Sequence, residues 1–137
     1  MTFDELGLAL SSTGDWEGSI PHFEAAVEKS PKWGALRFSL AAAYGQIGRM
    51  NDARRELETA LKLNPEDYRT NLVLGRMLTL QGEPAKGLLI LKKADQLQPN
   101  DFNVHLFLAD TYDRLSQKAA AQRERAAAER LRLAGKP

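Results

Sequence analysis

The sequence repeats with a period of 34 residues, and this spacing constrains the fold more than any other feature. Glycine stands at positions 14, 48 and 82, and proline stands at positions 31, 65 and 99, so both columns advance by 34. Further columns keep the same step and hold apolar or small residues: Leu6, Leu40, Leu74 and Leu108; Gly7, Ala41, Gly75 and Ala109; Leu10, Tyr44, Leu78 and Tyr112; Ala26, Ala60, Ala94 and Ala128. Self-similarity at a period of this length indicates a stack of identical supersecondary units.

The second copy shows the plan of the unit. Apolar residues at helical spacing predict a helix over residues 35–46. Gly48 is expected to end it, because glycine accepts the left-handed backbone that often follows a helix. Asn51 or Asp52 is expected to cap a second helix. Pro65 closes the unit, since the residue before a proline is pushed out of helical space.

A helix-turn-helix unit with these columns resembles the tetratricopeptide repeat family. The residues that carry the resemblance in the first copy are Phe3, Leu6, Gly7, Leu10, Ser19, Phe23, Ala26 and Pro31. The resemblance covers almost the whole chain, and it implies an all-α, right-handed superhelical solenoid of about four helix-turn-helix repeats. We expect a single array over residues 1–137, with copies at about 1–33, 34–67, 68–101 and 102–133.

The first copy departs from the pattern at Pro21. A proline in a helix interior costs about 3 kcal/mol, because it removes a hydrogen bond and clashes with the preceding turn. We therefore expect an irregular or kinked turn over residues 15–19, followed by a regular helix over residues 20–28.

The two ends of the array also differ from its middle. Residues 117–133 are rich in alanine, arginine and glutamate, which predicts a helix that caps the array with a polar outer surface. The first copy begins at Met1 with no capping segment before it. Two interpretations stay open: the chain is a piece of a longer array, or its first repeat tolerates an exposed face.

Composition excludes several classes of protein. The hydrophobic share of 43% and the charged share of 27% are those of a soluble folded chain. A net charge of +1 argues against a nucleic-acid partner, which would require a basic face. No apolar run approaches the roughly 20 residues that span a bilayer, and no signal peptide is visible. The absence of cysteine excludes disulfides and thiolate metal sites but does not identify the compartment, for which we favour the cytoplasm.

The charges are distributed unevenly along the chain. Residues 1–30 hold six acids and one base, a net charge of −5, whereas residues 117–137 hold six bases and two acids, a net charge of +4. We expect a weak head-to-tail attraction between copies, screened by salt.

No residues at readable spacing indicate catalysis, so we expect neither an enzyme nor a cofactor. The two histidines, His22 and His105, lie in different copies, and a surface or groove position explains each better than a metal site does.

The resemblance implies a concave groove lined by the first helix of each copy, which receives a peptide or a partner helix. The predicted binding residues in copies two to four are Ser39, Ala42, Gln46, Arg69, Val73, Arg76, Leu80, Phe107, Asp110 and Arg114. Met1, Glu5, Leu8 and Ser12 hold these positions in the first copy. Within each copy they step by three and four residues and so share one helix face. Phe38, Leu72 and Leu106 lie at its edge, where we expect them to pack between adjacent first helices.

Two arginines make the groove selective. Arg69 and Arg76 lie two helical turns apart, about 10 Å along one face. Asp110, one copy further on, is the expected neighbour of Arg76. A guanidinium group binds a carboxylate through two parallel hydrogen bonds, so we expect an extended ligand with at least one acidic group. An apolar side chain of the ligand is expected near Val73, Leu80 or Phe107.

The sequence therefore predicts a protein–protein interaction module, or scaffold, without catalysis. Two alternatives stay open: a homotypic assembly module, and a docking or regulatory segment of a larger enzyme or of a secretion or assembly protein. The identity of the partner and the pathway do not follow from the sequence.

Overall fold

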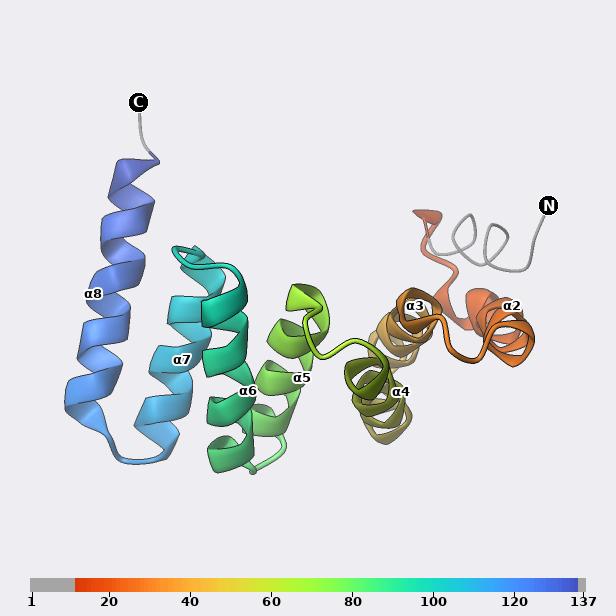
Figure 1. Cartoon of the computed structure of the whole chain (residues 1–137), viewed down its shortest axis with the longest axis horizontal. Helices are drawn as coiled ribbons and strands as arrows, with labels where there is room; N and C mark the ends of the chain where they lie inside the picture. Colours follow the sequence, from red (N-terminus) through yellow and green to blue (C-terminus); the bar gives the residue numbers. More distant parts are fainter. Residues whose placement is uncertain (1–11, 136–137) are drawn as a thin grey trace. The chain divides into compact units, whose positions relative to one another are not determined.

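A computed structural model describes residues 12–135, and every regular element in this range is an α-helix (Figure 1). The chain divides into two compact units, one up to Pro65 and the other from Glu66. The first unit holds α2 (Trp16–Lys29), α3 (Gly34–Gln46) and α4 (Met50–Leu63). The second unit holds α5 (Tyr68–Leu80), α6 (Pro84–Leu97), α7 (Phe102–Arg114) and α8 (Lys118–Ala134). The prediction of an all-α helical repeat is confirmed, while the first helix expected in copy one lies outside the described residues.

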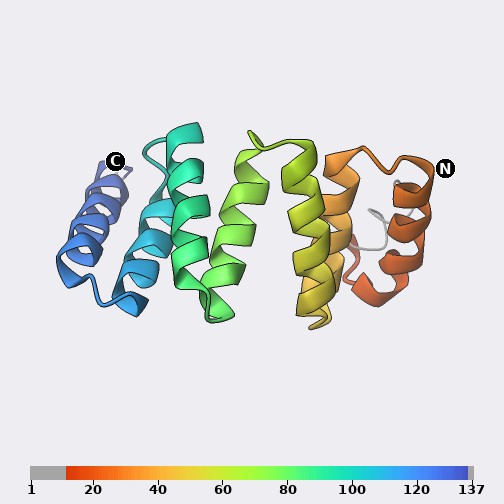
Figure 2. The same cartoon turned by 60° about the horizontal axis from the view of Figure 1, so that its bottom comes forward.

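In the second unit each helix packs against the next one in the chain. Helix α5 lies beside α6, α6 beside α7, and α7 beside α8, with short connections between them (Figures 1 and 2). The core of this unit lies between α6 and α7 and holds Leu91, Ala94, Val104 and Leu108. Partly buried side chains from α5, α6 and α7 pack around it: Tyr68, Leu72, Leu88, Phe107 and Tyr112.

Small residues let the two helices of a copy approach closely. Ala53 on α4, Gly87 on α6 and Ala121 on α8 occupy one repeat column, and all three are buried. A Cβ atom at Gly87 would lie 2.3 Å from the Thr79 hydroxyl oxygen and 2.8 Å from the Gly75 carbonyl oxygen. No side chain fits at this position unless the backbone of α5 shifts, so the glycine sets the spacing of α5 and α6.

The first unit is built in the same way from α2, α3 and α4, which contact one another in chain order. Phe23, Leu40 and Leu57 are buried at its centre. The Tyr44 hydroxyl donates a hydrogen bond to a Glu24 carboxylate oxygen at 2.8 Å and so joins α3 to α2. Burial and this acidic neighbour raise the pKa of Tyr44 to about 12.

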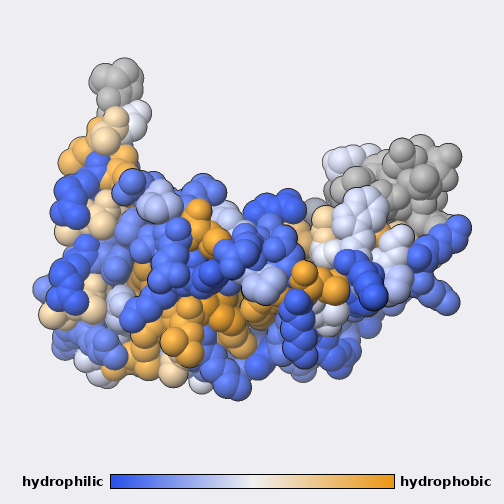
Figure 3. Space-filling model, viewed as in Figure 1, coloured by the Kyte–Doolittle hydropathy of each residue, from blue (hydrophilic) through white to orange (hydrophobic). Residues whose placement is uncertain are grey.

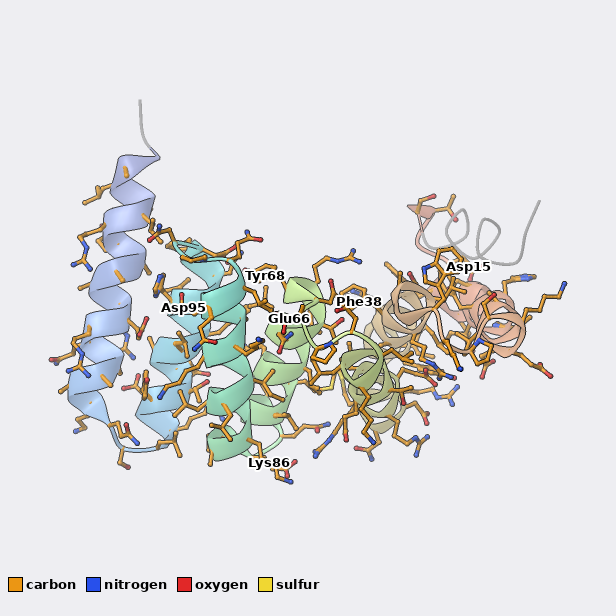
Figure 4. The ribbon with its side chains drawn as sticks, in the orientation of Figure 1. Asp15, Phe38, Glu66, Tyr68, Lys86 and Asp95 are labelled. Carbon is orange, nitrogen blue, oxygen red and sulfur yellow. The ribbon has the colours of Figure 1, made fainter. Side chains whose placement is uncertain are left out.

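The expectation of an irregular turn before Pro21 is wrong. Helix α2 begins at Trp16 and runs through Pro21 without interruption. Asp15 caps it, since its carboxylate accepts a hydrogen bond from the Gly18 amide at 2.9 Å (Figure 4 labels Asp15). Ser19 is buried in the turn before the proline, and its hydroxyl donates to the Trp16 carbonyl oxygen at 2.6 Å. Capping and burial thus offset the hydrogen bond that proline removes.

The prediction of the N-terminal cap of α4 is also wrong. Helix α4 begins at Met50, so Asn51 and Asp52 lie inside its first turn and Arg49 occupies the cap position. Asp52 accepts a hydrogen bond from the Arg49 guanidinium at 2.7 Å and also pairs with Arg55. An acid in the first turn stabilises a helix through its dipole without capping it, which explains the misplaced boundary.

The boundaries predicted for α3, at residues 35–46, and for α8, the expected cap helix, at residues 117–133, agree with the structure to within one residue. Gly14, Gly48 and Gly82 all have a positive φ, between 85° and 87°. The turn between the two helices of a copy requires this left-handed backbone, which glycine adopts without strain. Ser116 stands in the same column and takes the same left-handed conformation, with φ of 61°. A side chain in this region is strained, at about 1–2 kcal/mol.

Replacing Ser116 with glycine should therefore stabilise the second unit. We expect Ser116→Gly to raise its free energy of unfolding by about 0.5–1 kcal/mol, because the relief of strain exceeds the entropy that glycine adds to the unfolded chain. Urea denaturation followed by circular dichroism measures the change.

The matched control is the reverse substitution at the same turn one copy earlier. Gly82→Ser should lower the free energy of unfolding by a similar amount. An unchanged or less stable Ser116→Gly variant would show that the turn imposes no strain on the serine.

Candidate functional site

The face predicted on α5 is accessible in the structure. Asp67 caps this helix by accepting a hydrogen bond from the Thr70 amide at 3.2 Å, and the helix then presents Arg69, Val73, Arg76 and Leu80 at helical spacing. Val73 is 38% exposed and Leu80 is 53% exposed, large fractions for aliphatic side chains. Arg69 is exposed and Arg76 is half-buried. This row combines cationic and apolar groups on one helix face.

Helix α7 brings three of its predicted residues to Arg76. The Arg76 guanidinium donates a hydrogen bond to a carboxylate oxygen of Asp110 at 2.6 Å, so the expected neighbour is confirmed. Arg114 donates to the same oxygen at 3.1 Å. The guanidinium carbon of Arg76 also lies 4.9 Å from the centre of the Phe107 ring, within the range of a cation–π contact. We call Arg69, Val73, Arg76, Leu80, Phe107, Asp110 and Arg114 the α5–α7 surface.

Asp110 stays ionised between its two arginines. Partial burial by itself raises the pKa of Asp110, but the hydrogen bonds from Arg76 and Arg114 outweigh burial and hold the pKa below its ordinary value. Asp110 therefore carries its charge at neutral pH. One carboxylate neutralises one of the two guanidinium groups, so this cluster remains cationic.

The net charge of the α5–α7 surface is +2, from three arginines and one aspartate. Phe107 and Asp110 hold the Arg76 side chain from two sides, which fixes the plane of its guanidinium group. A fixed plane reduces the entropy lost when a ligand carboxylate binds. The surface is thus organised to accept an anion.

Buried threonines fasten the two helices beneath this surface. The hydroxyl groups of Thr79 on α5 and Thr111 on α7 lie 2.9 Å apart and share a hydrogen bond. Each hydroxyl also reaches a carbonyl oxygen four residues back in its own helix, that of Gly75 or Phe107. At the N-terminal end of α5, the ammonium group of Lys93 on α6 forms an ion pair with a Glu66 carboxylate oxygen at 3.0 Å. Glu66 lies two residues before Tyr68, the first residue of α5, and Figure 4 labels both.

The other predicted binding residues lie in the first unit. Ala42 and Gln46 are exposed on α3, and the half-buried Ser39 donates its hydroxyl hydrogen to the Ala35 carbonyl oxygen at 3.1 Å. These three share one face of α3, which stays a separate prediction for that unit. Met1, Glu5 and Leu8 lie outside the described residues.

The edge residues behave differently from one another. Leu72 is partly buried and packs against the core cluster of α6 and α7 residues. Leu106 is 39% exposed, so the prediction that it packs between first helices is wrong. No further first helix follows α7 in the described part of the chain, so none covers Leu106 there. Phe102, one turn before Leu106, is exposed on the same side.

The sequence reasoning also missed an apolar surface on α6. Leu89 is 72% exposed and lies among the lysines of that helix, and Figure 3 shows apolar surface gathered over its lower half. The available signal was a leucine on the polar face, three residues after Lys86 and four before Lys93.

Neither a metal site nor a membrane span is found among residues 12–135. No group of three potential ligands there could hold a metal ion, and no helix is long and apolar enough to cross a membrane. His105 of α7 lies 2.6 Å from a Glu124 carboxylate oxygen of α8, so it links two helices.

Comparison with known proteins identifies the repeat. The family model described as tetratricopeptide repeat matches residues 38–102. Residues 38–102 contain tetratricopeptide repeats. The family supports a general role in protein–protein interaction and names no partner.

Two curated proteins have similar sequences. Superkiller protein 3 of Schizosaccharomyces pombe is 26% identical over 112 residues, which are 82% of this chain and 8% of that protein. BBSome complex member BBS4 of Mus musculus is 33% identical over 78 residues, which are 57% of this chain and 15% of that protein. The chain thus spans only a small part of either relative.

Solved structures share the tetratricopeptide fold of this chain. A structure titled MamA 41-end from Desulfovibrio magneticus RS-1 has a TM-score of 0.90 at 21% identity, covering 98% of this chain and 76% of that one. Another, titled MamA MSR-1 C2, has a TM-score of 0.86 at 22% identity, covering 98% and 77%. At these identities the likeness concerns the fold alone.

Because Arg76 and Arg114 both donate hydrogen bonds to Asp110, the pKa of its carboxyl group should depend on both arginines. Because the pKa of Asp110 is lowered, its contribution to stability is present above the unfolded-state value and is lost as the pH falls through the folded-state value. Carbon-13 NMR titration of the carboxyl group should show that Arg76→Gln raises the pKa of Asp110, and that Arg114→Gln raises it less. A pKa that is identical in wild type and both variants would mean that neither arginine holds the carboxylate in solution.

Proposed function

We propose that this protein is an interaction module whose α5–α7 surface binds an extended segment of a partner protein through an acidic group and a neighbouring apolar side chain. The observation that carries the proposal is the guanidinium of Arg76, held between Asp110 and Phe107 beside exposed apolar residues. BBS4, one of the similar proteins, is by name a member of a complex, which is consistent with a binding role.

The acidic group follows from the charges of the surface. Arg76 and Arg114 share one carboxylate, so a second carboxylate can approach them without displacing Asp110. Arg69 extends the positive potential along α5, and it is exposed. Hydrogen bonds between a guanidinium and a carboxylate are about twice as strong as those between neutral groups, which favours an acidic ligand over a polar one.

The apolar group follows from the side chains that alternate with the arginines. Val73 and Leu80 flank Arg76 on the same face of α5, one turn away on either side. Both remain substantially exposed, and burying an aliphatic side chain of a ligand against them would contribute about 25 cal/mol for each Å² removed from water. A ligand in extended conformation could place an acid on the arginines and an apolar group on either neighbour.

Selection from a displayed library of random twelve-residue peptides tests the proposal. Peptides enriched on the wild-type protein should carry aspartate or glutamate close to leucine, isoleucine or phenylalanine. Arg69→Glu combined with Arg76→Glu should weaken their binding at least about tenfold, with helicity unchanged in circular dichroism. Because a glutamate at position 76 would face Asp110, Arg76→Gln supplies a milder variant, for which we expect a smaller loss.

The matched control is Lys62→Glu combined with Lys86→Glu, which changes the net charge equally on α4 and α6. This variant should bind the selected peptides as the wild type does. Equal binding by the wild type and the double arginine variant would show that the α5–α7 surface is not the binding site.

A further inference from the structure

Helix α8 carries a row of exposed residues that its own fold does not use. Ala119, Arg123, Ala126, Arg130 and Leu133 step by four, three, four and three residues, so they form one stripe, and all are exposed. The opposite side of the helix is buried through Ala121 and Ala128. Leu133 is 53% exposed. We call this row the α8 stripe.

The arginines of the α8 stripe differ from the other charged residues of the helix. Arg125 pairs with Asp113, Arg132 pairs with Glu129, and Glu124 contacts His105. Arg123 and Arg130 make no ion pair or hydrogen bond with any residue in the range 12–135. Two guanidinium groups therefore stand about 10 Å apart on one face, separated by small residues.

Helix α2 carries a stripe of the opposite charge. Glu17, Pro21, Glu24 and Glu28 step by four, three and four residues, and all are exposed. Glu17 and Glu24 are seven residues apart, the same separation as Arg123 and Arg130, so both pairs span about 10 Å. Glu24 bonds to the Tyr44 hydroxyl through one carboxylate oxygen, while Glu17 and Glu28 have no partner among the described residues. We call this row the α2 stripe.

We propose that the α8 stripe of one molecule binds the α2 stripe of a second copy of this chain. The equal spacing lets two arginine–glutamate pairs form at once, and Ala119 and Ala126 let the helices approach closely. Because the two surfaces are different, the contact is heterologous, and it either closes into a ring or adds further copies in a row. Exposed charge pairs are individually weak and screened by salt, so the association is weak and strongest at low ionic strength.

Sedimentation velocity at 20 mM and 500 mM salt tests the contact. The wild-type protein should associate at low salt with rising protein concentration and be monomeric at high salt. Arg123→Glu combined with Arg130→Glu should weaken the low-salt association by about tenfold or more, because attraction becomes repulsion. Lys62→Glu combined with Lys86→Glu, which changes the net charge equally, should leave it intact.

A charge exchange separates this contact from general electrostatic attraction. The variant with Glu17→Arg and Glu24→Arg, the pair whose spacing matches that of the arginines, should also fail to associate with itself. Mixed with the Arg123→Glu, Arg130→Glu variant, it should associate, since the unaltered α8 stripe of one variant again meets the unaltered α2 stripe of the other, and the two altered stripes are also complementary. A wild-type monomer at low salt and millimolar concentration, or a mixture that does not associate, would overturn the proposal and leave the α8 stripe to an acidic partner of another kind.

Discussion

The close approach of paired helices is the constraint on which the rest of the structure depends. Alanine or glycine recurs every 34 residues where the two helices of a copy cross, and at Gly87 the space is so small that only hydrogen fits. This contact sets the distance between α5 and α6, and the core between α6 and α7 then positions α7. The ion pair between Arg76 and Asp110 joins α5 to α7, so its geometry follows from the packing below it.

Most of the fold could be predicted from the sequence because its determinants are periodic. A glycine in the turn column, an apolar stripe and a small-residue column each recur in phase, and the bounds predicted for α3 and α8 agree with the structure to within one residue. The prediction failed where a local residue competes with the repeat. Proline at 21 suggested a break, but burial of Ser19 and the Asp15 cap keep α2 helical.

The candidate site was predictable only in part. The 34-residue step from Arg76 to Asp110 showed that equivalent positions of adjacent copies meet, and the structure confirms that contact. The ring of Phe107 against Arg76 and the bond of Arg114 to the same carboxylate depend on side-chain directions, which spacing alone does not determine. The exposure of Leu106 depends on whether the first helix of a further copy packs over it. The sequence of a single copy does not show whether such a helix is present.

Amide hydrogen exchange of two glycine variants tests the central claim most directly, that the close approach at Gly87 holds the second unit together. Overpacking by one methyl group costs about 1–3 kcal/mol, whereas alanine in place of glycine inside a helix gains about 1 kcal/mol where space is available. At Gly45 of α3 an added Cβ meets nothing within 4 Å. Gly87→Ala should accelerate exchange throughout α5, α6 and α7, while Gly45→Ala should leave exchange in α3 and α4 unchanged or slower. Equal protection in both variants would contradict the account.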